Sequence, residues 1–260
     1  MKKMRTFKTS VAALALLTVA VTSGSAFASA GAPTPPKQDW SFSGLFGTFD
    51  RGAAQRGFQV YKEVCSACHS MNLLSYRHLA GIGFSEDEIK AIASSVEVTD
   101  GPDDEGEMFQ RAGLPADRFA APFPNTKAAA ASNNGKAPPD LSLITKARGD
   151  GSNYVYALLT GYKDEIPHDV EVPEGGNYNA YFPGHVIAMA PPLSDDAVEY
   201  TDGTKATLDQ HARDVVTFLT WAAEPEMEKR KTMGIKVLLF LLVLSGMLYA
   251  VKRQVWRDQH

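Results

Sequence analysis

Cysteine is scarce in this sequence: the 260 residues include two, Cys65 and Cys68. A disulfide framework needs more cysteines at wider spacing, and a structural zinc site needs more ligands than this pair provides. A thioredoxin-like redox pair lies beside a βαβ pattern, and the sequence shows none. Internal repeats are absent as well. The role of the two cysteines therefore depends on the residues around them.

Basic residues are scarce in the central part of the chain. Residues 31–228 contain 15 basic and 29 acidic side chains, a net charge of −14, whereas the whole chain has a net charge of −4. Such a charge repels nucleic acid and anionic membrane surfaces and favours basic partners. Plain solubility explains the same charge, and composition does not decide between the two. We expect no nucleic-acid partner.

The two ends of the chain have the features of targeting and anchoring segments. A basic start, a short apolar run and small residues predict a signal peptide at 1–28, cleaved after Ala28 or Ala30. Residues 232–251 carry one charge, Lys236, and are long enough for a transmembrane helix. An uncleaved N-terminal anchor and a buried C-terminal core helix are the alternatives. The expected arrangement is a single-pass protein of a bacterial inner membrane.

This arrangement divides the mature chain into three parts. Export by the signal peptide leaves a periplasmic domain at 40–228, the transmembrane helix at 232–251 and a cytoplasmic tail at 252–260. Apolar spacing and capping residues predict helices near 50–64, 85–93, 140–146, 153–161 and 208–223. Gly57 is costly inside the first of these, so we expect another helix backbone to come close there. Loops are expected at 97–107, 113–140 and 162–192.

The segment Cys65-Ser66-Ala67-Cys68-His69 has the spacing of a c-type haem attachment motif. Each cysteine can form a thioether bond with a haem vinyl group, and the two lie about one turn apart. Both therefore reach the same edge of one macrocycle, and His69 is placed to ligate the iron. Covalent attachment keeps haem from dissociating outside the cell. The sequence predicts one haem c, bound through Cys65 and Cys68.

A second axial ligand must come from the other side of the haem. Met189 lies in an apolar loop, 186–192, which contains two prolines, and a thioether ligand in a dry pocket raises the redox potential. A core position is the simpler role for this methionine, and His185 is the rival ligand. Arg148 can pair with a haem propionate or be an ordinary surface arginine. The weaker candidates for the axial position are Met71, Met108, Met227, His78, His168 and His211.

Several blocks of the sequence resemble the cytochrome c1 family, the haem subunits of cytochrome bc1 complexes. Beside the haem motif, the matching blocks are 56–61, 70–74, 138–142, 147–148, 154–162, 181–184, 189–193 and 221–226. The resemblance implies a mostly α, cytochrome-c-like haem domain with long loops plus one C-terminal transmembrane helix. In that fold the helix before the haem motif crosses the helix before the anchor, so that Gly57 meets 218–221.

The resemblance also implies site residues. His69 and Met189 would be the iron ligands, Arg148 would pair with a propionate, and the residues near the haem would be Pro139, Asn133 and Tyr154. Some bacterial relatives have an extra cysteine pair that bridges a loop. This chain has none, so packing must hold its loop at 162–180.

The function implied by the resemblance is one-electron transfer. The haem would accept electrons from the Rieske iron–sulfur protein and donate them to cytochrome c, within a dimeric complex that also contains cytochrome b. The acidic surface would steer a basic cytochrome c. A haem enzyme or gas sensor needs an open sixth position, which Met189 opposes. An independent tethered carrier usually has a smaller domain and a longer linker.

Overall fold

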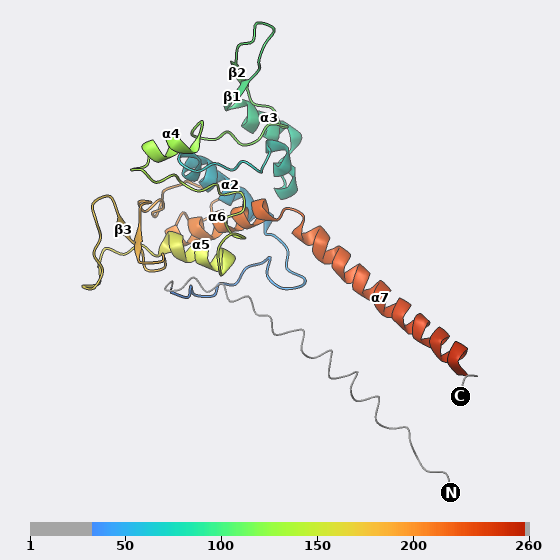
Figure 1. Cartoon of the computed structure of the whole chain (residues 1–260). Helices are drawn as coiled ribbons and strands as arrows, with labels where there is room; N and C mark the ends of the chain where they lie inside the picture. Colours follow the sequence, from blue (N-terminus) through green and yellow to red (C-terminus); the bar gives the residue numbers. More distant parts are fainter. Residues whose placement is uncertain (1–32, 258–260) are drawn as a thin grey trace. The chain divides into compact units, whose positions relative to one another are not determined.

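The computed structural model describes residues 33–257, and most of its regular structure is helical, with long connecting loops (Figure 1). The predicted signal peptide and its cleavage site lie outside the described residues. The elements in chain order are α2 (Arg51–Glu63), η1 (Cys65–Ala67), η2 (Tyr76–Ile82), α3 (Glu86–Ser94), β1 (Glu97–Asp100), β2 (Phe109–Ala112), α4 (Thr126–Ala131), α5 (Gly151–Thr160), β3 (Asn177–Tyr178), β4 (Val186–Ile187), α6 (Leu208–Ala223) and α7 (Met227–Trp256).

The core of the domain forms where α2 packs against α6 (Figure 1). Side chains cap both helices at their N-termini, Asp50 on α2 and Thr207 on α6. The rings of Phe58 and Phe218 meet edge to face with centroids 5.6 Å apart, and Trp221 of α6 is fully buried. Because α2 leads directly into the haem motif, this packing fixes the position of the two cysteines.

The two helix backbones come very close at Gly57. A Cβ at this position would lie 1.9 Å from the carbonyl oxygen of Asp214 and 2.8 Å from Cβ of Phe218. The close approach that the sequence predicts at Gly57 is therefore confirmed, and so is the crossing of α2 with α6.

We expect Gly57→Ala to destabilise the domain by about 3 kcal/mol, because the backbone of α6 must move to make room. Gly52 on the same helix is the control, since a Cβ there has its nearest neighbour, Oδ1 of Asp50, at 3.4 Å. Gly52→Ala should be neutral or stabilise the protein by up to about 1 kcal/mol through helix propensity. Urea unfolding of the full chain in detergent measures both. Equal stabilities of the two variants would contradict the close approach.

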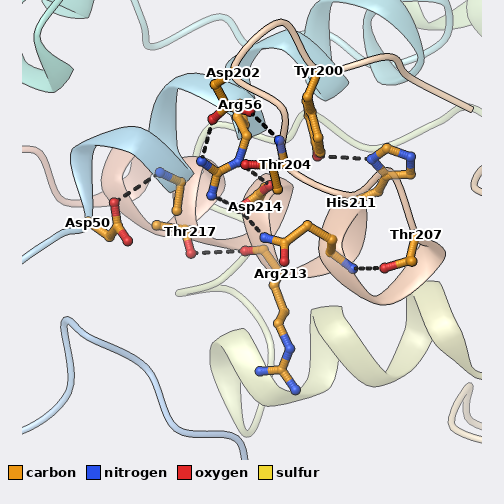
Figure 2. A network of polar contacts seen from close by, with 12 residues as sticks. Asp50, Arg56, Tyr200, Asp202, Thr204, Thr207, His211, Arg213, Asp214 and Thr217 are labelled. Carbon is orange, nitrogen blue, oxygen red and sulfur yellow. Dashed lines mark hydrogen bonds and ion pairs between the residues drawn. The ribbon is translucent and has the colours of Figure 1, made fainter. Parts of the chain in front are cut away.

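An ion pair joins α2 and α6 beside this contact (Figure 2). The Arg56 guanidinium donates to both carboxylate oxygens of Asp214, at 2.8 and 3.0 Å, and to Asp202 at 2.9 Å. The Asp214 side chain is 1% exposed. In the same network Nδ1 of His211 lies 2.9 Å from the Tyr200 hydroxyl, and His211 is fully buried.

The predicted loop at 97–107 is wrong in its first part. Strand β1 pairs with β2, with Glu97 opposite Ala112 and Asp100 opposite Phe109. Arg111 holds the hairpin together through ion pairs with Asp100 and Asp117. These partners lie across the hairpin and beyond it, so local composition does not reveal them. The acidic segment that joins the strands is exposed.

The predicted helix at 140–146 is also wrong, since these residues form a series of turns. The Asp140 carboxylate accepts N–H groups from Asn72 and Ser142, both at 2.8 Å, and these bonds hold the chain in a non-helical path. Short elements interrupt two of the expected loops: α4 lies within 113–140, and β3 and β4 lie within 162–192. The predicted helices at 85–93 and 208–223 are confirmed, and so is the helix at 153–161, which begins two residues earlier.

Helix α7 is the one described helix that is long and apolar enough to cross a membrane, and it includes 232–251. Its start is fastened to the domain. Glu228 accepts from the N–H of Phe49 at 2.7 Å and from Arg51 at 2.7 Å. Glu224, in the short connection from α6, pairs with Lys146 at 2.8 Å and with Arg230. Helix α7 therefore begins directly at the folded domain, without a flexible linker.

Candidate functional site

The haem motif occupies a tight turn at the end of α2. The N–H groups of Cys68 and His69 both donate to the carbonyl of Cys65, at 3.1 and 2.9 Å. No disulfide joins the two cysteines. Burial raises the pKa of Cys65 to about 12. Two cysteine side chains on one turn suit thioether bonds to one haem.

His69 is oriented by the backbone of Pro139. Its Nδ1 lies 2.7 Å from the Pro139 carbonyl oxygen, which can only accept, so Nδ1 carries the proton and Nε2 keeps its lone pair. Burial lowers the pKa of His69, although the bond to Pro139 opposes this effect. A neutral imidazole with a free Nε2 is the form that ligates a metal. The structure thus brings together two of the residues that the sequence predicts for the site.

Asp140 holds this arrangement in place, and sequence reasoning missed it as a site residue. Its carboxylate accepts from the Ser70 hydroxyl at 2.9 Å and from the N–H groups of Asn72 and Ser142. Burial alone would raise the pKa of Asp140, but these hydrogen bonds hold it below its usual value. The available signal was an aspartate two residues before a serine, which is typical of an Asx turn. Asp140 therefore fixes Pro139 beside His69.

Met189 is held through its backbone, since its carbonyl accepts from the Tyr162 hydroxyl at 3.0 Å. The same loop is fastened at Asn179, which is fully buried. The Asn179 amide donates to the Leu158 carbonyl at 2.8 Å and accepts from the N–H of Tyr181 at 3.0 Å. Sequence reasoning missed both Tyr162 and Asn179. Hydrogen bonds to the end of α5 hold the Met189 loop.

We expect Tyr162→Phe to loosen the Met189 loop without unfolding the domain. A hydrogen bond of this kind contributes about 0.5–1.5 kcal/mol to stability. Its loss corresponds to a rise of up to about tenfold in the population of molecules in which Met189 is detached from the haem iron. Imidazole binding to the ferric haem, followed by absorption, measures that population. Tyr178→Phe is the control, because no described residue hydrogen-bonds the Tyr178 hydroxyl. The same imidazole affinity in both variants would rule out a role for Tyr162.

The rival axial ligand, His185, lies in the turn before β4. Its φ is +62°, its ring stacks on Tyr178 with centroids 5.9 Å apart, and its buried Nδ1 has no hydrogen-bond partner among the described residues. The weaker candidates lie in other settings: His78 in a helix cap, His211 in the network beside Arg56, Met71 and Met227 in the core, His168 and Met108 exposed.

The positive charge of Arg148 acts on the side chain of Tyr154. Burial raises the pKa of the half-buried Tyr154, and the positive charge of Arg148 partly offsets that rise. Arg148 is exposed and forms no ion pair with a carboxylate of residues 33–257. An exposed guanidinium without a carboxylate partner among residues 33–257 fits a propionate. The Asn133 amide donates to Ala129 on α4 at 2.8 Å, and no described hydrogen bond joins Asn133 to His69.

The residues present therefore fit a haem c. Such a group, when bound, supplies reversible one-electron chemistry at iron. The chain contributes two thiols on one turn, a neutral imidazole whose ring Pro139 orients, and a methionine loop that Tyr162 holds. None of these tasks needs a proton transfer or a nucleophile from the protein.

Comparison with known proteins agrees with this geometry. A family model described as "Cytochrome C1 family" matches residues 40–259. "Cytochrome c1" of Rhodospirillum rubrum is 52% identical over 250 residues, which cover 90% of this chain and 92% of the relative. "Cytochrome b/c1" of Bradyrhizobium diazoefficiens is 48% identical over 90% of this chain and 37% of the relative. "Cytochrome b-c1 complex catalytic subunit, mitochondrial" of Candida albicans is 52% identical over 85% of this chain and 77% of the relative. The chain therefore belongs to the cytochrome c1 family and carries one covalent haem c, attached through Cys65 and Cys68.

Proposed function

We propose that this chain is the haem subunit of a cytochrome bc1 complex, where it accepts single electrons from a Rieske iron–sulfur protein and donates them to cytochrome c. The observation that carries the proposal is the contact between His69, in the haem turn, and the carbonyl of Pro139. This contact orients the imidazole for ligation. Membership of the cytochrome c1 family supports the role within a cytochrome bc1 complex. Cytochrome b and a dimeric complex belong to the same proposal, in which the complex as a whole is a quinol:cytochrome c oxidoreductase.

In the proposed site, His69 and Met189 ligate the iron and Arg148 pairs with a propionate. Pro139, Asn133 and Tyr154 lie near the haem. The exposed Arg148 guanidinium, which has no carboxylate partner among residues 33–257, supports this assignment, as does the hydrogen bond that holds the Met189 loop near the end of α5. We expect none of these residues to act in proton transfer.

In the proposed arrangement, residues 1–28 are removed, 40–228 form the periplasmic domain, 232–251 cross the bacterial inner membrane and 252–260 lie in the cytoplasm. The length and hydropathy of α7 and its fastening to the domain support this arrangement. The net charge of −14 over residues 31–228 supports a basic cytochrome c as acceptor, because complementary charge raises the rate of transient encounters.

Membranes of a bacterial strain that lacks this chain test the function. On addition of quinol, the Rieske centre should become reduced while added cytochrome c stays oxidised. Expression of the wild-type chain should restore cytochrome c reduction, with a rate that falls as ionic strength rises. Full cytochrome c reduction in the strain without the chain would sink the proposal.

A further inference from the structure

A closed, uncharged loop, residues 41–48, lies beside the start of α7. The N–H of Thr48 donates to the carbonyl of Ser41 at 3.0 Å and closes the loop. Gly44 has a φ of +73°, which favours glycine. At Gly47 a Cβ would lie 2.0 Å from the carbonyl oxygen of Ser43, so the backbone passes directly over itself there. These features give the loop one defined shape.

The base of this loop is buried and its tip is exposed. Phe42 is 8% exposed, and its ring lies 5.4 Å from that of Phe49 between centroids. At the tip, Leu45 is 57% exposed and Phe46 is 80% exposed. Phe46 is thus more exposed than any large apolar side chain of α7. Two adjacent apolar side chains at such exposure indicate a surface that another medium or molecule covers.

Two contacts fasten the loop to α7. The Lys231 ammonium donates to the carbonyl oxygens of Phe42 at 2.7 Å and Gly47 at 3.0 Å, which lie on either side of the tip. Lys231 is the residue directly before the apolar segment 232–251. The loop therefore lies level with the first turn of that segment, where a spanning helix enters the bilayer.

We propose that Leu45 and Phe46 insert into the lipid around the start of α7 and form a second membrane anchor for the haem domain. The occupant is lipid because Lys231 holds the loop beside the first turn of the apolar segment, where Met233 and Val237 are also exposed. Residues 41–48 carry no charge, so the loop brings no charged side chain of its own into lipid, and the Lys231 ammonium at its base keeps two hydrogen bonds to loop carbonyls. A helix alone leaves a domain free to tilt, and a second contact beside it restrains that motion.

The inference rests on the proposal that α7 spans the membrane. The test distinguishes failure of that proposal from failure of the loop tip to insert into lipid. A nitroxide label is placed at Phe46→Cys in the full-length, haem-loaded chain, in vesicles of phosphatidylcholine and phosphatidylglycerol. The introduced thiol is unique, because haem occupies Cys65 and Cys68. The measurement is the ratio of label accessibility to oxygen and to a water-soluble nickel chelate. Reference labels are Ser94→Cys, exposed on α3, and Leu242→Cys, on α7.

We expect the ratio at position 46 to exceed that at 94 by at least about threefold and to approach that at 242. Adding Lys231→Met to the labelled chain should release the loop and lower the ratio. A ratio at 46 equal to that at 94 would overturn the inference, because the tip would then lie in water. A label shielded from both reagents would overturn it as well, since protein would cover the tip. A water-like ratio at 242 would overturn the spanning arrangement together with the inference.

Discussion

Replacement of Met189 by leucine is expected to lower the midpoint potential of the haem by on the order of a few hundred millivolts. Axial-ligand identity sets haem potentials over a range of about 0.8 V, and a thioether ligand favours the reduced iron. Leucine has a similar volume but offers no lone pair, so the sixth position becomes available to outside ligands. We therefore also expect carbon monoxide to bind the variant and not the wild type. A redox titration of the full chain in detergent, followed by visible absorption, measures the shift.

His185→Asn is the matched control for this experiment. Asparagine tolerates the positive φ of position 185, so the turn before β4 is kept while the imidazole is lost. The control should retain the wild-type potential within a small shift. If the potential instead falls in His185→Asn and is unchanged in Met189→Leu, the sixth ligand is His185, and the proposed axial pair is wrong.

Replacement of Arg56 by methionine is expected to destabilise the domain by about 3–5 kcal/mol, because it leaves a buried carboxylate without its counter-charge. The Asp214 carboxylate is 1% exposed and takes two hydrogen bonds from Arg56, as Figure 2 shows. Gln210 also donates to Asp214 at 3.0 Å, but an amide does not neutralise the charge. Urea unfolding of the full chain, followed by circular dichroism, measures the loss.

Two further variants make this result specific. Arg51→Met removes an ion pair with Glu228 in which the arginine is 43% exposed, so its cost should be about 0–1 kcal/mol. The double variant Arg56→Met, Asp214→Leu removes both charges and should recover most of the stability, since a buried pair and an apolar pair of similar volume are often nearly equivalent. Similar losses in Arg56→Met and Arg51→Met would mean that burial of Asp214 has no energetic role.

The sequence predicts the parts of the fold that depend on local chemistry. Helix α6 has the predicted bounds, because its apolar spacing and the Thr207 cap lie within one stretch of chain. The haem turn is likewise local, since five consecutive residues specify it. Gly57 was identified by its cost in a helix, and the physical reason is the backbone of α6 at Asp214. In each case the signal lies within a short stretch of chain, although the backbone that explains Gly57 belongs to the distant helix α6.

The predictions that fail depend on partners outside the local stretch of chain. Asp140 can cap a helix, but its carboxylate is taken by Asn72, 68 residues earlier, and a set of turns results. The β1–β2 hairpin depends on the ion pair between Arg111 and Asp100, which lie on different strands. Tyr162 and Met189 are 27 residues apart, and neither carries a pattern that predicts the other. The roles of Arg148 and Asn133 toward haem stay predictions.

The adjacency of Cys68 and His69 has a thermodynamic consequence. A dissociable cofactor stabilises the native state by an amount that depends on its free concentration, so its protein loses stability on dilution. Here the cofactor stays on the chain when the protein unfolds, and re-forming the iron–imidazole bond is an intramolecular event across a very short span, for which the effective concentration is high. The melting temperature should therefore be independent of protein dilution and of added free haem, and refolding needs no second encounter with the cofactor.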